Sequence, residues 1–249
     1  MHNDKGPEAN SMPPEPISLF HSLSGFDPSL IDRYVIGEKY VGIMLSNGNI
    51  GVCAVLEHKV DNSLLFSGKP DLASGSHRVI LNAYYNALLN YEETVDGTGD
   101  IFDSTGFSRY RNIVMIGEFG SLLEKFSGRG TEIKVFDRLS DSEFLIPMRR
   151  QPEMLAAADC VILSGTTINN NTFIEVISKT SDSCNILLLG PSNILSREMF
   201  KYRNIKVVFG SHFRNGDEEV LDIIREGRGT KGLLKNLNKV YISAPDFRL

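Results

Sequence analysis

The sequence predicts an α/β protein in which a doubly wound parallel sheet follows a smaller α+β domain. From Arg111 onward, short apolar segments rich in β-branched residues alternate with helical patterns. Their continuous apolar character is typical of central parallel strands, and helices between parallel strands imply a doubly wound sheet. Before that point, two strand-like segments flank an Asn-Gly turn and an amphipathic helix follows, which is typical of a small α+β unit.

The α+β unit is predicted to cover residues 17–91. Its strands are Tyr40–Leu45 and Ile50–Leu56, joined as a hairpin through Asn47-Gly48. Ser76 can cap the helix that follows, whose apolar stripe packs on the hairpin. Residues 1–16 are polar and rich in proline, so we expect a flexible tail. Residues 92–108 contain three glycines and no apolar period, so we expect a linker, with the second domain at 109–249.

The second domain contains five or six expected strands with helices between them. The strands are Asn112–Ile116, Glu132–Phe136, Cys160–Ser164, Asn185–Leu189, Lys206–Phe209 and, as a short last one, Val240–Ile242. The helices are Ser121–Phe126, Gln151–Ala157, Asn171–Lys179, Ser196–Lys201 and Asp217–Glu226.

Composition excludes several classes of protein. The 249 residues are 41% hydrophobic and carry a net charge of -5, which offers no general attraction to nucleic acid or to anionic lipid. No apolar run approaches the roughly 20 residues of a membrane span, and the first residues lack the apolar core of a secretory signal. We therefore expect a cytoplasmic protein with no nucleic-acid or membrane partner. The three cysteines are too few and scattered for a disulfide framework, and His and Cys never cluster at metal-ligand spacing.

The candidate site lies in the loops after the strands, because ligands of doubly wound sheets bind outside the carboxyl ends of the strands. These loops are small and polar, and four of the five main strands are followed by glycine. The ligand-binding candidates are Gly117, Glu118, Phe119, Asp137, Gly165, Thr166, Thr167, Asn169, Asn170, Thr172, Gly190, Pro191, Ser192 and Gly210.

Alternative interpretations apply to each part of this set. Gly117 and Gly120 match only part of a dinucleotide-binding fingerprint, although Asp137 stands where that fingerprint places its ribose-binding carboxylate. The loop from Gly165 to Thr172 suits an anionic or polar ligand, whereas one of its asparagines is also a natural helix cap. Glu118 and His212 are the candidate catalytic residues. The simpler alternatives are an exposed loop glutamate and a surface histidine.

Three segments at the strand ends carry a family resemblance. Ile116–Phe119, Ala158–Thr172 and Leu189–Ser192, which include Gly-Thr followed by Asn-Asn-Thr and then Gly-Pro-Ser, resemble the family called "Putative heavy-metal chelation". The resemblance covers about residues 17–245 and implies an enolase-N-terminal-like domain followed by a Rossmann-like domain. It also implies a ligand cleft between the domains, a homodimer, and a link to the handling of metals or metal chelators. Glu118 departs from the family pattern, so no role is carried over to that position.

Together these observations predict a protein that binds a small anionic or metal-complexed metabolite in the interdomain cleft. A metal would be held by oxygen ligands from separate loops or arrive with a chelating molecule. The alternative is an enzyme with a nucleotide-type cofactor, in which Asp137 holds the ribose and Glu118 or His212 moves a proton. A third interpretation, a structural or oligomeric partner, requires that a second subunit cover the loops.

Overall fold

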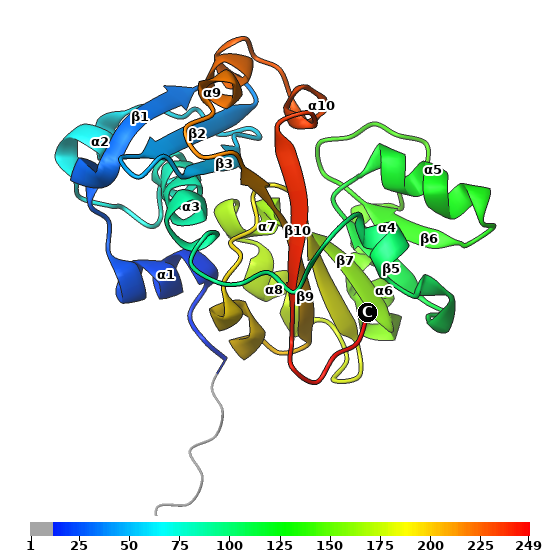
Figure 1. Ribbon diagram of the computed structural model, residues 1–249. Coiled ribbons are helices and arrows are strands. Elements are labelled where there is room, and N and C mark those ends of the chain that lie inside the picture. The colour runs from blue at the N-terminus through cyan, green and yellow to red at the C-terminus, as the bar shows by residue number, and fades with distance from the viewer. Residues whose placement is uncertain (1–11) are drawn as a thin grey trace, which may run out of the picture.

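The computed structural model describes residues 12–249 and contains two β-sheets (Figure 1). Residues 1–11, most of the predicted tail, lie outside the described residues. The end of that tail is ordered, contrary to expectation. The carboxylate of Glu15 accepts hydrogen bonds from the N–H groups of Ile17 and Ser18 and so caps α1 (Pro16–Ser24). Glu15 also pairs with the buried Arg78 at 2.6 Å.

The smaller sheet is antiparallel and contains the predicted hairpin. Its strands are β1 (Ile31–Ile36), β2 (Tyr40–Leu45) and β3 (Ile50–Ala54), and the short helices η1 (Pro28–Leu30) and α2 (Ser63–Ser67) lie beside it. The hairpin of β2 and β3 is confirmed, with Gly48 at φ +83° in its turn. Helix α3 (Gly75–Leu89) packs on this sheet and begins earlier than predicted, because Ser74 and not Ser76 caps it through the His77 N–H.

A helix from the C-terminal half covers the other face of the small sheet. Helix α9 (Glu218–Arg225) contacts β1 and β2 (Figure 1). Gly51 faces α3 and Gly42 faces α9, from opposite faces of the hairpin. Every residue of β2 and β3 is therefore buried. The sequence analysis had placed this helix among those of the parallel sheet.

The larger sheet has seven strands in the order β4-β10-β9-β8-β7-β5-β6. Strands β5 to β9 are parallel, and β10 and β4 extend the sheet antiparallel at one edge. The first four parallel strands confirm the predicted ranges to within one residue, whereas β9 and β10 are longer than predicted. The bounds are β4 (Gly97–Thr98), β5 (Ile113–Ile116), β6 (Ile133–Phe136), β7 (Cys160–Ser164), β8 (Asn185–Leu189), β9 (Ile205–Phe213) and β10 (Leu237–Ser243).

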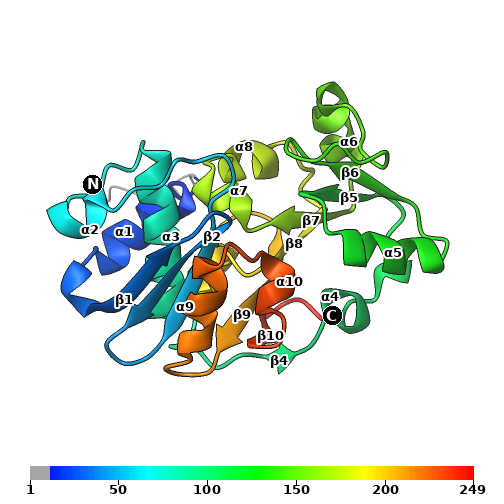
Figure 2. The same cartoon turned by 90° about the horizontal axis from the view of Figure 1, so that it is seen from above.

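Helices cover both faces of this sheet, as expected for a doubly wound fold (Figure 2). On one side lie α4 (Ile101–Ser104), α5 (Gly120–Gly128) and α10 (Thr230–Leu233). On the other lie α6 (Gln151–Ala157), α7 (Thr166–Asn169) and α8 (Phe173–Ser178). The helix predicted at 196–201 is the 3-10 helix η4 (Arg197–Lys201), and two further 3-10 turns are η2 (Phe107–Arg109) and η3 (Met148–Arg150).

The segment predicted as a linker, 92–108, is part of the fold. It contributes β4, which pairs with β10, and helix α4. Ile101, Phe102 and Phe107 are buried against α5, and Phe107 packs edge-on against Phe126 at 4.9 Å between ring centroids. The aromatic residues of this segment are too widely spaced to form a helical or strand period, yet they complete one side of the core.

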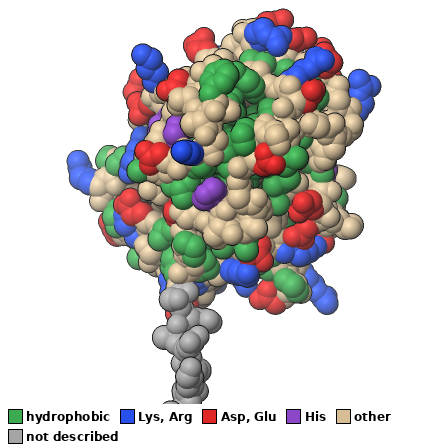
Figure 3. Space-filling model, turned by 90° about the vertical axis from the view of Figure 1, so that its left-hand side faces the viewer, with side chains coloured by type: hydrophobic (Ala, Val, Ile, Leu, Met, Phe, Trp, Pro, Cys, Tyr) green, Lys and Arg blue, Asp and Glu red, His purple; other side chains and the backbone are tan. Residues whose placement is uncertain are grey.

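The end of the molecule formed by α1, α2 and β1 exposes several large apolar side chains. Leu23, Leu30, Tyr34 and Phe66 are exposed there, with Phe66 the most exposed at 79%. In a view of that end, exposed hydrophobic side chains lie among scattered charged ones (Figure 3). Among residues 12–249, no helix combines the length and the apolar character needed to cross a bilayer.

Candidate functional site

The strand order creates a switch point between β5 and β7. The chain leaves β5 toward β6 on one side and returns to β7 on the other side of β5. The order β6-β5-β7-β8-β9 is that of the flavodoxin type of doubly wound sheet, in which ligands bind at such a reversal. The loops that meet there begin at Gly117 after β5 and at Gly165 after β7. These are two of the loops that the sequence analysis selected.

A cavity of about 270 Å³ opens at this switch point, and we call it the acidic cavity. It brings together seven of the predicted ligand-binding residues from the ends of β5, β6 and β7. Those seven are Gly117, Glu118, Asp137, Thr166, Thr167, Asn170 and Thr172. Its other lining residues are Leu56, Ile116, Phe136, Arg138, Leu139, Ser140, Met148, Gln151, Ser164, Glu175 and Val176.

Glu118 and Asp137 line this cavity together. The Glu118 backbone N–H donates to Asp137 Oδ2 at 2.7 Å, and the Leu139 N–H donates to Oδ1 at 2.7 Å. The Ser140 hydroxyl donates to the Glu118 carboxylate. Because both carboxylates are half-buried and oriented by hydrogen bonds, their remaining lone pairs are held in fixed positions for a ligand. The sequence could not determine whether these two residues face one cleft.

Hydroxyl and amide groups form the facing wall of the cavity. Ser164 Oγ and Thr166 Oγ1 are 2.8 Å apart, and the Thr172 hydroxyl donates to Asn170 Oδ1 at 2.6 Å. The Thr167 hydroxyl donates to the Ser164 carbonyl oxygen at 2.8 Å and so also secures the turn. Ser164, which the sequence analysis missed because it is the last residue of a strand, therefore belongs to the polar wall.

Three other predicted residues line neither this cavity nor the second pocket described below, and two of them connect the two sheets. The buried Asn169 donates from Nδ2 to the Ala54 carbonyl oxygen at 2.9 Å, and Ser192 Oγ accepts from the Ala54 N–H at 3.0 Å. Gly165 is buried so tightly that an added Cβ would lie 2.4 Å from Asn193 Oδ1. These residues therefore support the loops of the site without lining either pocket.

A row of three asparagines, two on α3 and one at its C-cap, also links this helix to the loop that follows β8. Asn82, Asn86 and Asn90 are spaced by four residues and are all buried. Asn82 and Asn86 donate to the Ser192 carbonyl oxygen, and Asn90 accepts from the Leu195 N–H at 2.7 Å. The sequence analysis did not select this row. The signal was available, since three asparagines at helical spacing beside an apolar stripe predict a buried polar contact.

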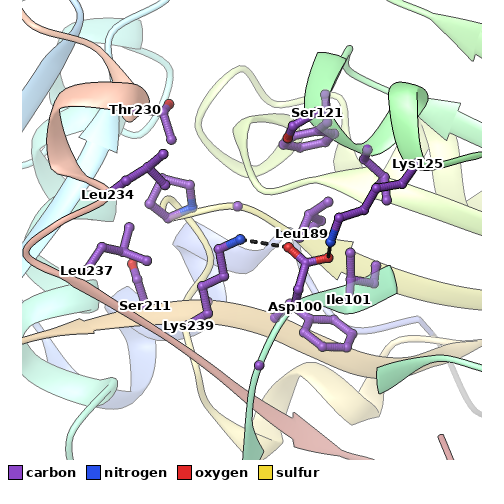
Figure 4. A pocket seen from close by; sticks show the side chains of 17 residues that line it. Asp100, Ile101, Ser121, Lys125, Leu189, Ser211, Thr230, Leu234, Leu237 and Lys239 are labelled. Carbon is purple, nitrogen blue, oxygen red and sulfur yellow. Dashed lines mark hydrogen bonds and ion pairs between the residues drawn. The ribbon is translucent and has the colours of Figure 1, made fainter. Parts of the chain in front are cut away.

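The remaining predicted binding residues line a second pocket of about 140 Å³, which we call the lysine pocket (Figure 4). It lies on the α4, α5 and α10 side of the sheet. Phe119, Gly190, Pro191 and Gly210 are the predicted residues in it. They are joined by Gly99, Asp100, Ile101, Ser121, Leu122, Lys125, Leu189, Phe209, Ser211, Thr230, Leu234, Leu237 and Lys239.

The sequence analysis placed Gly210 and His212 in a loop after a strand, and the structure corrects this. Both are inside β9, where Gly210 pairs with Val240 of β10 and His212 pairs with Asn238. The His212 ring stacks on Tyr91 at 4.7 Å, and its Nε2 lies 2.5 Å from the Asn90 carbonyl oxygen. Burial lowers the pKa of His212, and the contact with Asn90 partly opposes that effect. His212 lines neither the acidic cavity nor the lysine pocket.

Comparison with known proteins gives a family and a fold. The model of the family DUF364, described as "Putative heavy-metal chelation", matches residues 100–243, more than half of the chain. This chain belongs to that family. No curated protein matches the chain.

Two solved structures from the same family, both of unknown function, share the fold. The protein from Pyrococcus horikoshii is 22% identical with a TM-score of 0.74, covering 86% of this chain and 93% of its own. The protein from Desulfitobacterium hafniense is 17% identical with a TM-score of 0.70, covering 91% of this chain and 97% of its own. At these identities the likeness concerns the fold alone.

The described residues of this heavy-metal chelation family member do not fit a bare soft metal ion. Between residues 12 and 249, no group of three or more His, Cys, Asp and Glu side chains is arranged to hold one. All three cysteines are buried, and burial raises the pKa of Cys53 and of Cys184 to about 12. Thiolate is the form that binds soft metals, so these thiols are poor ligands at neutral pH.

We expect the cysteines to resist a thiol reagent in the folded protein. At pH 7.5, Ellman's reagent should label none of the three within minutes, because each sulfur is buried and protonated. In 6 M guanidinium chloride all three should react at once. Rapid labelling of even one cysteine under native conditions would show that a thiol is available for metal binding after all.

Proposed function

We propose that this protein binds a small metabolite that carries a metal ion or another cationic group, and that the acidic cavity is its binding site. The observation that supports this most directly is the convergence of Glu118 and Asp137 with a wall of hydroxyl groups at the switch point of the sheet. Ligands of this fold class bind at such a position.

The charges of the lining favour a cationic ligand over a simple anion. Among the described residues, Glu118 and Asp137 contribute two carboxylates to the cavity without a basic partner, whereas the carboxylate of Glu175 is ion-paired with Lys179 at 2.6 Å, and Arg138 is the one basic side chain among the lining residues. An anion without a metal would meet net repulsion in this half-enclosed setting. Of the two ligand classes that the sequence favours, the metal-complexed metabolite is therefore the better match.

The number of carboxylates also favours a complex over a free ion. A hard divalent cation bound by protein alone needs about six oxygen ligands in close geometry. Here the Asp137 oxygens already accept two backbone hydrogen bonds, and Ser140 engages Glu118. A chelating metabolite would bring most of the ligands itself, and the threonine hydroxyls and Asn170 would bind its polar groups. A cavity of about 150 Å³ accommodates a benzene ring, so about 270 Å³ suits a larger chelate.

The test is native mass spectrometry of the purified protein, followed by titration with defined probes. The probes are Ni²⁺ and Zn²⁺ alone, histidine alone, and the 1:1 metal–histidine complexes, which carry net positive charge. We expect the complexes to bind more tightly than either component. Glu118→Gln should weaken that binding by about tenfold or more, since it removes one charge from the contact.

Glu124→Gln is the matched control. Glu124 is exposed on α5 and lines neither pocket, so its loss should leave binding unchanged. The free metal ions binding as tightly as their complexes would contradict the proposal, as would equal affinities of the two variants.

A nucleotide-type cofactor is the second candidate, supported by the position of Asp137. This residue directly follows β6, beside the Gly117 turn, where dinucleotide-binding sheets place the carboxylate that binds a ribose. The position of Glu118 argues against a nucleotide-type cofactor, because the Glu118 carboxylate would face the phosphates next to that turn. Thermal denaturation with ATP, NAD, NADP and FAD tests this candidate, and the absence of any shift would exclude it. The homodimer and the cytoplasmic location stay predictions from the sequence.

A further inference from the structure

The lysine pocket differs in chemistry from the acidic cavity. The Phe119 ring lies at their border, 3.8 Å from the position that a Cβ on Gly190 would take and 3.9 Å from that of a Cβ on Gly117. Beyond this ring the lining is mainly apolar, with Ile101, Leu122, Leu189, Pro191, Phe209, Leu234 and Leu237. Its volume of about 140 Å³ is close to the 150 Å³ or so of an apolar cavity that accommodates one benzene ring.

One carboxylate and two ammonium groups form the polar side of the pocket. Asp100 lies between Lys125 of α5, at 3.0 Å, and Lys239 of β10, at 2.7 Å (Figure 4). These lysines and the Phe102 N–H outweigh the effect of burial and hold the pKa of Asp100 at about 2. Lys125 also reaches Asp103 at 3.3 Å, outside the pocket lining. The lining groups by themselves carry one positive charge in excess, which Asp103 balances from outside the pocket.

Two further features indicate a ligand. Helix α5 has nine residues, and its first turn lines the pocket through Ser121 and Leu122 without a side-chain cap. The positive end of its dipole favours an anion there. Independently, the hydroxyl of Ser211 lines the same pocket, is only 3% exposed as a residue, and has no hydrogen-bond partner among the described residues. A buried hydroxyl without a partner costs stability unless a bound molecule satisfies it.

We propose that the lysine pocket is a second binding site, for a small aromatic carboxylate. The ring fills the apolar part of the pocket, next to Phe119 and Phe209. The carboxylate binds Lys239 and the first turn of α5, in competition with Asp100. A polar substituent on the ring reaches Ser211. This site is separate from the acidic cavity and does not depend on the function proposed for that cavity.

The test uses benzoate as the probe, with benzamide as its neutral counterpart of the same shape. Isothermal titration calorimetry, with ligand-detected NMR for weak binding, should show benzoate binding at least tenfold more tightly than benzamide. Lys239→Met keeps the apolar stem and removes the charge, so it should weaken benzoate binding about tenfold. Asp100→Asn removes the competing carboxylate and should strengthen it. Equal binding of benzoate and benzamide, or a weaker interaction in Asp100→Asn, would overturn the proposal.

Controls separate this site from general charge effects and from the acidic cavity. Lys206→Met removes an ion-paired lysine of the same sheet, bound to Asp246, and should leave benzoate affinity unchanged. Glu118→Gln should also leave it unchanged. Ser211→Ala should reduce the affinity for 4-hydroxybenzoate relative to benzoate. A loss of benzoate binding in Glu118→Gln as large as in Lys239→Met would show that the lysine pocket is not a separate site.

Discussion

Replacing Arg78 by methionine should lower the free energy of unfolding by about 3–5 kcal/mol. The residue is 3% exposed, and its guanidinium binds both oxygens of Glu15, at 2.6 and 3.0 Å. It also donates to the carbonyl oxygens of Leu72, Ile168 and Asn169. Methionine fills most of the volume but leaves Glu15 unpaired and these carbonyl oxygens without a donor, which accounts for the large effect.

Urea denaturation of the wild type and the variant measures this loss. Arg225→Met is the control, since Arg225 is exposed on α9 and pairs only with its neighbour Asp222 among the described residues. An exposed pair of that kind contributes less than about 1 kcal/mol. Similar losses in the two variants would refute the assignment of Arg78 as the buried link between α3 and α7. The contact between Arg78 and α7 also affects the acidic cavity, because α7 carries Thr166 and Thr167, which line it.

Replacing Gly51 by alanine should destabilise the protein by about 3 kcal/mol, through overpacking. A Cβ at this position would lie 2.1 Å from the Ala83 carbonyl oxygen and 2.2 Å from the Ala87 nitrogen, both in the backbone of α3. Backbone atoms in a buried helix cannot rotate aside, so β3 and α3 would have to separate. The midpoint of urea denaturation should fall accordingly.

Gly128→Ala provides the matched control. An added Cβ on Gly128, the last residue of α5, would meet no atom within 4 Å. Alanine there should stabilise the protein by about 0.5 kcal/mol, because it restricts the unfolded chain. A similar loss at both positions would mean that the close approach of β3 to α3 is not what requires glycine at 51.

Eleven of the fourteen predicted binding residues line one of two pockets, which meet at Phe119. Proximity in the sequence does not predict which pocket a residue lines. Gly117, Glu118 and Phe119 are consecutive, yet the first two line the acidic cavity and Phe119 lines the lysine pocket. The direction of each side chain at the end of β5 decides it. Ligand binding in each pocket can be tested by a single charge change, since Glu118 lines only the acidic cavity and Lys239 lines only the lysine pocket.

The sequence by itself determined the features that depend on local pattern. Asn47-Gly48 specifies the hairpin, because that pair tolerates the backbone conformation of the turn. The apolar runs at 113–116, 160–164 and 185–189 specify buried parallel strands, because both of their faces are covered. The loops that follow these strands then had to meet at one edge of the sheet.

Only the tertiary structure decided which distant segments share a surface. Helix α9 is amphipathic, but nothing in its own residues indicates that its apolar side covers β1 and β2 and not the parallel sheet. Likewise, Asn169 and Ser192 have the chemistry of ligand-binding residues, but Asn169 Nδ2 and Ser192 Oγ are engaged by the backbone of Ala54. Periodicity and turn chemistry act between neighbours in the chain, whereas burial and hydrogen-bond partners depend on segments up to 138 residues apart in these contacts.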